Sequence, residues 1–547
     1  MIPFTLMILW VILFTTLWPI VVRVGSRKMS MIRYRTGEVR LVMKAIRILI
    51  LTLAPVGFLA ACSKRSTQMD TEITRLRLVD GRSVPTTELT AFVEQTMEKA
   101  DVTGLSCAII NEGRVVYRKA FGKSNKSTGA RNDEETVFSA ASFSKPVFAY
   151  LVMLLAEEGV VDLDKPLYEY LARPLYEYPA YADLKGDERT KQITARMALS
   201  HSTGFPNWRF LEADGRLKFL FSPGERHSYS GEGIALLQMV VEEVTGKDLE
   251  TLAQEKIFQP LGMTRSSYIW QAAYEGNAAS PHDEFGRPRG ESIQRNKPDA
   301  AGSMVTTAGD YARFISLGIL NVEGKRQATI DEMLRPQIAI NYKAMFGPEA
   351  WQGTDQYQDI GLAWGLGWGR FDTPHGRAFF HTGHSFGWQN YTVTYADKGI
   401  GIVLLGNSEN LESVAQEIVA KAIGDVYTPF GWLGYTPFDP SRPKATPPPE
   451  PITIEVDPAI LVTYAGSYDM QPTALIQIKF EDSRLWILSM DGKRWDPLYA
   501  ETEARFFVKG EEAYRFEFIR DESGQVTALR LEFRGIQLPV APRMEPK

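Results

Sequence analysis

The chain has 547 residues, of which 44% are hydrophobic and 23% charged, so it is too long for one core and too apolar to be disordered. Its net charge is −5; residues 1–61 hold eight Lys or Arg against Glu38, a net of +7 that leaves −12 for the remainder. An acidic body without a basic patch argues against a nucleic-acid partner. The only two cysteines, Cys62 and Cys107, exclude a disulfide framework.

Residues 43–62 have the layout of a secretory signal peptide. Lys44 and Arg47 precede an apolar run over 48–61, and small residues precede Cys62. The ending LAAC also resembles the bacterial lipobox, in which the cysteine is lipidated and becomes the mature N-terminus. The resemblance implies a lipid anchor at Cys62 on the periplasm-facing side of a bacterial envelope membrane. A cleaved signal with an incidental cysteine is the alternative.

A second apolar segment lies upstream, over residues 2–22. It is uncharged, long enough to span a membrane, and followed by Arg23, Arg27 and Lys28. Two leaders in tandem are unusual, so we favour a start codon assigned too early, with Met43 the true first residue, over a real extra span. We therefore divide this region into a leader over 1–61, with the signal at 43–61, and a flexible tail over 62–82.

The next part of the chain alternates helical and strand patterns. Helix, two strands, a mostly helical middle, further strands and a closing helix predict an α+β domain over 83–425, with its sheet assembled from both ends and helices on its faces. The predicted elements are an amphipathic helix at 87–100, a hairpin of strands 104–110 and 114–121, an apolar helix at 138–155, helices at 232–245, from Thr307 through Phe314 and at 411–423, and alternating strands over 362–407.

The apolar helix carries the first chemical signal. It reads FSAASFSKPVFAYLVMLL, and its first turn holds Ser142 and Lys145 on one face. The serine's N–H lies among the unpaired donors of the helix start. A lysine desolvated there has a lowered pKa and can take a proton from a serine nucleophile. Serine and lysine at this spacing occur by chance about once or twice in such a chain, so the tetrad is a signal only together with other motifs.

The C-terminal part has a different composition. Residues 426–457 form a linker whose central stretch, 436–451, holds seven prolines and cannot enter a core. Residues 458–547 contain short alternating stretches separated by turn residues, which predict a small all-β domain, either a sandwich or a lipocalin-like barrel.

Four segments of the predicted α+β domain join the Ser-x-x-Lys tetrad. They read LSHSTGF at 199–205, FSPGERHSYSGEGIALL at 221–237, IFQPLGMT at 257–264 and FFHTG at 379–383. Together they resemble the serine β-lactamase and penicillin-binding protein superfamily, in the class C-like branch that includes esterases and D-amino-acid peptidases. The resemblance covers residues 83–425 and implies a β-lactamase/transpeptidase-like fold.

The resemblance also implies roles for individual residues. The nucleophile would be Ser142, its proton partner Lys145, and the general base Tyr229. The oxyanion hole would be the backbone N–H groups of Ser142 and His384. His381, Thr382, Gly383 and Gly231 would line the substrate pocket. We assign no functional role to His201 and Asn207, which we interpret as loop residues beneath or beside the pocket.

Two of these positions depart from the family pattern. Gly231 stands where the family has an asparagine that grips a substrate amide, and His381 stands where β-lactamases usually have a lysine. Both changes argue against efficient β-lactam hydrolysis. We expect an ester, a D-amino-acid amide or a cell-wall peptide as substrate.

Other catalytic motifs fail on their context. Gly383 to Gly387 is a literal G-x-S-x-G, but a strand and not a helix is predicted after it, and no histidine follows His384. His381 and His384 lack the partners of a zinc motif, so we predict no metal and no cofactor.

Two classes of function remain. The first is a lipid-anchored serine hydrolase that forms an acyl-enzyme on a small-molecule or peptide substrate. A β-lactamase proper is an alternative within this class. The second class is a non-catalytic lipoprotein that binds penicillin or cell-wall peptides. The sequence does not indicate the oligomeric state.

Overall fold

The structure is a computed structural model that describes residues 73–544, apart from 213, 290–293, 322–323, 442–445, 448–450, 471–473, 489–493, 510–513 and 534–535. The predicted signal peptide, the upstream segment 2–22 and Cys62 lie outside the described residues. Among the helices that are described, none is long and apolar enough to cross a membrane.

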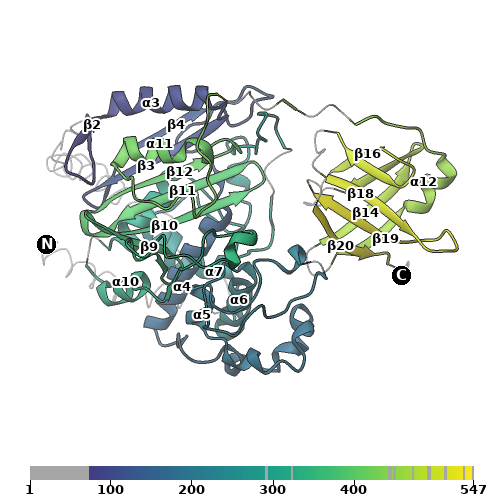
Figure 1. Cartoon of the computed structure of the whole chain (residues 1–547), viewed down its shortest axis with the longest axis horizontal. Helices are drawn as coiled ribbons and strands as arrows, with labels where there is room; N and C mark the ends of the chain where they lie inside the picture. Colours follow the sequence, from purple (N-terminus) through teal and green to yellow (C-terminus); the bar gives the residue numbers. More distant parts are fainter. Residues whose placement is uncertain are drawn as a thin grey trace, which may run out of the picture. The chain divides into compact units, whose positions relative to one another are not determined.

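An antiparallel eight-stranded sheet forms the centre of the first domain (Figure 1). Two strands from the start of the domain pair with its last strand, because β3 lies between β4 and β12. The prediction of a sheet assembled from both ends is therefore confirmed. In spatial order the strands are β4 (Arg114–Gly122), β3 (Gly104–Asn111), β12 (Ile400–Gly406), β11 (Trp388–Tyr395), β10 (Gly376–Ser385), β9 (Gly369–Thr373), β8 (Ala363–Trp364) and β7 (Ile338–Ala339).

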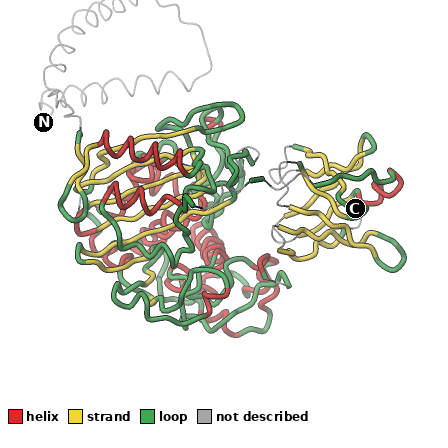
Figure 2. The backbone as a smooth tube through the Cα atoms, turned by 45° about the horizontal axis from the view of Figure 1, so that its top comes forward, coloured by secondary structure: helices red, strands yellow, loops and turns green. Residues whose placement is uncertain are grey.

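Helices cover both faces of this sheet. On one face α3 (Thr86–Lys99) and α11 (Glu412–Ile423) lie side by side across the strands, as Figure 2 shows. They bury an apolar stripe each, including Leu89 and Ile418. On the other face lie α9 (Ala308–Arg313) and α4 (Ser144–Glu157), whose side chains from Ser144 to Leu155 are all buried, as expected for a helix that is apolar all round.

The remaining helices lie in the mostly helical middle of the chain. The starts of α6 (Gly231–Thr245) and of α9 are both capped by side chains. Ser230 caps α6 by accepting from the N–H of Gly233, and the helix ends at the left-handed Gly246. Thr307 caps α9, which continues as a π-helical turn to Ile319. The helices of this middle part are α5 (Ala195–Leu199), α6 (Gly231–Thr245), α7 (Leu249–Ala253), α8 (Gln259–Leu261) and α10 (Gln327–Leu334). A small sheet of β5 (Phe138–Ser139) and β6 (Val305–Thr306) accompanies them.

Both ends of this domain differ from the predicted boundaries. Part of the predicted flexible tail is folded, because β1 (Arg75–Arg77) pairs with β2 (Ser83–Pro85). The predicted linker begins too early at 426, because Trp432 is fully buried in the same core as α3 and α11. Its carbonyl accepts from the N–H of Met345 at 2.8 Å. An aromatic residue that fills a core outweighs the prolines that follow it.

The C-terminal domain is all-β except for the short helix α12 (Pro458–Tyr464) that opens it. Its eight strands follow one another in chain order and curl into a half-barrel, whose ends meet at a bridge between Tyr468 and Arg543. Of the two predicted forms, the barrel-like one is therefore correct. The strands are β13 (Gly466–Met470), β14 (Ala474–Glu481), β15 (Arg484–Leu488), β16 (Trp495–Ala500), β17 (Arg505–Val508), β18 (Tyr514–Arg520), β19 (Val526–Phe533) and β20 (Ile536–Pro542).

Candidate active site

Ser142 lies in the 3-10 turn η2 (Ala141–Phe143), which leads directly into α4. Ala141 has φ +46°, a conformation that non-glycine residues rarely adopt. It is held there by Ser144, whose hydroxyl donates to the Ala141 carbonyl at 2.6 Å and accepts from the N–H of Met304 at 3.1 Å. A strained residue directly before a partly exposed serine is typical of a functional site.

Lys145 is the partner of this serine. Its Nζ lies 3.0 Å from the Ser142 Oγ and donates to the Ala301 carbonyl at 2.6 Å. The side chain is 1% exposed, and this burial lowers the pKa of Lys145 to about 7, although the charge of Asp299 acts in the opposite direction. Near pH 7 about half of the molecules therefore hold a neutral Lys145 amine. A neutral amine within hydrogen-bonding distance of a hydroxyl can accept the proton of that hydroxyl.

Tyr229 lies on the other side of the amine. The Lys145 Nζ is 4.9 Å from the centre of its ring. Burial raises the pKa of Tyr229 well above its ordinary value, while the neighbouring Ser142 hydroxyl acts to lower it. Its hydroxyl is buried. The three residues predicted from the motifs are therefore brought together, with the proton of the phenol held more firmly than that of the amine.

The end of β10 lies beside the serine segment. Pairing with β9 stops at Phe380, whereas β10 runs on to Ser385, so its outer edge is open there. A Cβ at Gly383 would lie 2.5 Å from the Ala140 carbonyl, so only glycine allows this approach. From the neighbouring strand, the Asn390 amide donates to the carbonyls of Ser139 and Ala140. The backbone of residues 383–384 is thus fixed beside the approach to Ser142.

The side chains of His381 and His384 have different surroundings. His381 is fully buried, and its Nδ1 donates to the Thr382 carbonyl at 2.6 Å. Burial lowers the pKa of His381 to about 3, so the ring is neutral and offers no charge to a substrate carboxylate. The side chain of His384 is exposed, with Nε2 3.7 Å from Glu409. Thr382 is partly exposed on the same strand.

Gly231 does not face the pocket as expected. A Cβ there would lie 2.5 Å from Cζ2 of Trp208, so the indole covers this position. The Gly231 N–H is occupied as well, since it donates to the Asn207 carbonyl at 3.0 Å. Gly231 is therefore the first residue of α6 beneath an aromatic side chain and not a substrate contact.

The two loop residues predicted beside the pocket support it from below. The ring of His201 packs against that of Tyr229 at a tilt of 40°, with ring centres 4.2 Å apart, and its Nδ1 accepts from the N–H of Ser230. Burial lowers the pKa of His201 far below its ordinary value. Asn207 caps the first turn of α6 with its carbonyl and its side chain. Both residues hold the segment that carries Tyr229.

A hollow of about 170 Å³ opens next to Tyr229. Its walls combine aromatic and aliphatic side chains with polar groups in nearly equal measure, and the charged side chains among them are Glu212 and Arg226. The residues that line it are Pro206, Asn207, Trp208, Leu211, Glu212, Leu220, Arg226, His227, Ser228, Tyr229, Tyr342, Met345, Phe346, Gly347, Ala350 and Trp351.

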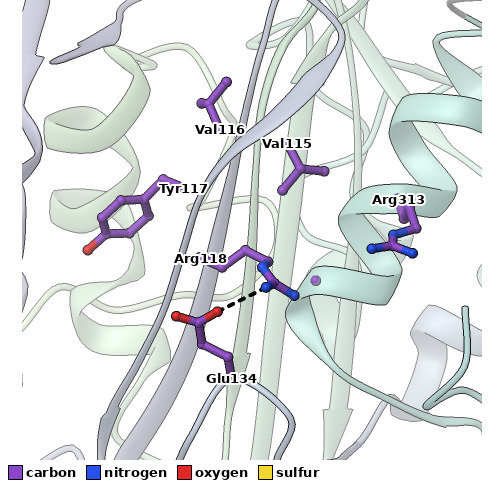
Figure 3. A pocket seen from close by; sticks show the side chains of 7 residues that line it. Val115, Val116, Tyr117, Arg118, Glu134 and Arg313 are labelled. Atoms are coloured by element: carbon purple, nitrogen blue, oxygen red, sulfur yellow. Dashed lines mark ion pairs between the residues drawn. The ribbon is translucent and has the colours of Figure 1, made fainter. Parts of the chain in front are cut away.

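Other potential sites hold no comparable chemistry. A hollow of about 340 Å³ beside β4 and α9 has no serine, cysteine or histidine in its lining, and its Arg118 pairs with Glu134 at 3.2 Å (Figure 3). The G-x-S-x-G stretch is a tight hairpin between β10 and β11, which confirms that it is not a nucleophile elbow. Within the described residues, no group of His, Cys, Asp or Glu side chains could hold a metal ion.

Three features of the site were not predicted from the sequence. They are the Ala301 carbonyl that binds Lys145, the Asn390 amide that ties β11 to the serine segment, and the indole over Gly231. The glycine at 231 was the one available signal, since a glycine inside a motif can mark a close approach of another group.

Comparison with known proteins places these features in context. A family model described as Beta-lactamase matches residues 89–424, more than half of the chain. A second model, described as a domain of unknown function, DUF3471, matches residues 450–544.

Two curated relatives and one solved structure resemble large parts of the chain. Penicillin-binding protein 4 of Amycolatopsis lactamdurans is 24% identical over 394 residues, or 68% of this chain and 94% of that protein. Esterase EstB of Burkholderia gladioli is 26% identical over 313 residues, or 51% of this chain and 77% of that protein. The octameric penicillin-binding protein homologue from Pyrococcus abyssi has the same fold, with a TM-score of 0.52 and 20% identity over 84% of this chain and all of that one.

Proposed function

The chain belongs to the β-lactamase family, and from this premise we propose that it is a serine hydrolase that forms an acyl-enzyme at Ser142. Its relatives include an esterase and a penicillin-binding protein, which supports a hydrolase of this family without indicating its substrate. An ester is the substrate class we favour, with a D-amino-acid amide or a cell-wall peptide as the alternatives.

One observation carries the proposal. The buried Lys145 amine, with a pKa of about 7, lies 3.0 Å from the Ser142 hydroxyl. A general base is most effective when its pKa lies near the working pH, because it is then both deprotonated and basic enough. A purely structural role for the buried lysine would not explain why its amine lies beside a hydroxyl on a strained turn.

The proton moves in a defined order. The Ser142 oxygen attacks the substrate carbonyl while its proton passes to the neutral Lys145 amine, and the leaving group then takes a proton from the ammonium as its bond to carbon breaks. Water hydrolyses the acyl-serine and the serine recovers its proton by the same route. The resemblance implied Tyr229 as the base, but its raised pKa favours Lys145 in that role. Tyr229 would instead donate a hydrogen bond as a neutral phenol.

The developing oxyanion needs donors of its own. We assign them to the backbone N–H groups of Ser142 and His384, because Gly383 and Asn390 fix those two segments side by side. Removal of one such donor typically costs about 3 to 4 kcal/mol of transition-state stabilisation. Main-chain donors are rigid, so they need no reorganisation during the reaction.

Labelling with a fluorophosphonate probe tests the proposal. We expect the wild-type protein to be labelled, Ser142→Ala to remain unlabelled, and Ser385→Ala to be labelled like the wild type. Ser385 is the matched control because it is the serine of the G-x-S-x-G stretch on the neighbouring strand end.

Two results would contradict it. Labelling that persists in Ser142→Ala would show that Ser142 is not the nucleophile. A folded wild-type protein that takes up neither a fluorophosphonate nor a fluorescent penicillin would support the non-catalytic alternative.

We further propose that the mature protein is lipid-anchored at Cys62, on the envelope side that faces the periplasm. The support is the sequence alone, namely the apolar run 48–61 and the LAAC ending. Metabolic labelling with a palmitate analogue should mark the wild-type chain and not Cys62→Ser; equal labelling of both would refute the anchor.

A further inference from the structure

At position 231 a glycine has no side chain, and the indole of Trp208 fills the space that a side chain would occupy. Three atoms of the Trp208 indole lie 2.5, 2.6 and 2.8 Å from where a Cβ at Gly231 would be. No side chain longer than hydrogen fits there while the indole stays. The site wall at the start of α6 is therefore an aromatic face and not a polar side chain.

The bonds on either side of Trp208 fix its position. On one side, the Asn207 carbonyl accepts from the N–H groups of Gly231 and Glu232, at 3.0 and 3.1 Å. On the other side, Arg209 forms a buried ion pair with Glu232, in which its Nε lies 2.9 Å from Oε1 and its backbone N–H 3.0 Å from the same oxygen. The loop is thus tied to the first turn of α6 at both neighbours of the tryptophan. A buried, bidentate pair holds a single geometry.

Trp208 also reaches the reacting groups. The Lys145 Nζ, which is bonded to the Ser142 hydroxyl, lies 5.9 Å from the centre of the Trp208 ring and 4.9 Å from that of Tyr229. The same two rings line the hollow of about 170 Å³. A group that enters this hollow therefore contacts the two rings that the Lys145 amine also approaches.

The size and lining of the hollow indicate what it can take. Phe346 and Trp351 stand at its mouth, each about half exposed, and Met345 is buried in its wall. A volume of this size accommodates roughly one aromatic ring or a short branched alkyl chain. The aromatic and aliphatic side chains in the lining favour contact with an apolar group, while the polar groups beside them orient it.

Charge in the hollow is balanced and constrained. The guanidinium carbon of Arg226 lies 5.1 and 4.7 Å from the ring centres of Tyr342 and Trp351, and the side chain donates to the Ala350 carbonyl at 2.6 Å. Glu212 brings the opposite charge and pairs with Lys218 at 3.2 Å. His227 is buried and neutral, because burial lowers its pKa to about 3. The lining thus combines apolar side chains with uncharged polar groups, one cation and one anion.

We propose that the hollow walled by Trp208 is a subsite for an uncharged aromatic or short branched alkyl group of an ester substrate, and that the Trp208–Gly231 contact determines this preference. The inference rests on the proposed function, since the ester is the bond that Ser142 would attack. It goes further by naming the residue pair that sets the substrate class.

The experiment compares three p-nitrophenyl esters that share one leaving group: the phenylacetate, the acetate and the hemisuccinate. The kcat/KM of each is measured for the wild type, Trp208→Ala, Gly231→Asn and the double variant. Trp270→Ala is the matched control, because Trp270 is similarly half-buried and does not line the hollow. Ser142→Ala tests the proposed function in the same assay.

We expect the ratio of kcat/KM for phenylacetate over acetate to fall at least tenfold in Trp208→Ala, since loss of one apolar contact surface in a pocket changes discrimination by about 10- to 100-fold. Trp270→Ala should keep the wild-type ratio. Gly231→Asn should lose activity on both esters, and the double variant should regain at least tenfold over Gly231→Asn because the indole no longer occupies the space.

The inference is overturned if Trp208→Ala keeps the wild-type ratio, or if Gly231→Asn is as active as the wild type. It is also overturned if the hemisuccinate is preferred tenfold over the acetate and Arg226→Met removes this preference, which would make the hollow a carboxylate site. If a fluorophosphonate labels Ser142 but the protein hydrolyses none of the three esters, this inference alone is overturned. Hydrolysis that persists in Ser142→Ala overturns the proposed function instead.

Discussion

At the scale of single residues, the site depends on an amine that is kept out of water. Lys145 is almost completely buried, and its one charged neighbour that acts to raise its pKa, Asp299, does not cancel the effect of burial. Burial disfavours the charged form of a lysine, so a fraction of the molecules holds a neutral amine at pH 7. The acyl-transfer proposal needs this fraction.

A pH profile follows directly from this state of Lys145. The rate of Ser142 phosphonylation should rise about tenfold per pH unit below pH 7 and level off above about pH 8, because the reactive form is the one in which the lysine has lost its proton. The measurement is the second-order labelling rate from pH 5 to 9. A rate that is constant across this range would exclude Lys145 as the base.

Part of this residue-level picture could be read from the sequence. Ser142 and Lys145 were found because a spacing of three places two side chains on one helical face beside an apolar run. The raised pKa of Tyr229 was not predictable, since it depends on burial by distant segments of the chain. The contact between Trp208 and Gly231 was not predictable either, because it depends on the path of a loop.

At the scale of elements, the junction between β10 and η2 determines the site geometry. The strand passes so close to the Ala140 carbonyl that only glycine fits at position 383, and Asn390 of the next strand holds the same segment. The turn before the helix places the nucleophile and one expected oxyanion donor, the Ser142 N–H, and the strand places the other, the His384 N–H. Their relative position is therefore set by one close backbone contact.

Gly383→Ala tests this junction. The added Cβ would lie 2.5 Å from the Ala140 carbonyl, so the strand or the serine turn must shift. We expect kcat/KM on an ester to fall by about 100-fold or more, since a displacement of about 1 Å at reacting groups has that effect. The control is Gly431→Ala, where no atom lies within 4 Å and the wild-type rate is expected.

The circular dichroism of both variants should match that of the wild type. Near wild-type activity of Gly383→Ala would mean that the close approach has no role in catalysis.

Most elements were predictable because their patterns are local. The predicted helix at 87–100 is α3, the predicted hairpin is β3 and β4, and the helix at 232–245 is α6. The helix predicted to end at Phe314 runs on as a π-helical turn, because Ile315 and Ile319 are buried in the core. Tertiary burial decided this boundary, as it did for Trp432 at the start of the linker.

At the scale of the whole molecule, the described residues contain separate hydrophobic cores. The two large clusters draw only on residues 76–433, and the cluster of the C-terminal half-barrel draws only on residues 461–541. A domain with its own core can fold by itself. Of the described residues in the proline-rich stretch, Phe438 packs against the second of the two large clusters, and no residue of the stretch belongs to the cluster of the half-barrel.

This separation predicts the behaviour of a shortened chain. A chain of residues 73–441 should unfold in a cooperative thermal transition and should be labelled at Ser142 at a rate within threefold of the longer chain. Differential scanning calorimetry and the labelling rate measure these properties. Loss of labelling in the folded fragment would mean that the half-barrel contributes to the site.

The central claim is that catalysis passes through an acyl group on the Ser142 oxygen, and the most direct measurement is peptide mapping by mass spectrometry after rapid acid quench of the enzyme with an activated ester. We expect the mass of the acyl group to appear on the peptide containing Ser142 within one turnover and to be absent from the peptide containing Ser385. Turnover without any acyl-serine, or an acyl group on another residue, would contradict it.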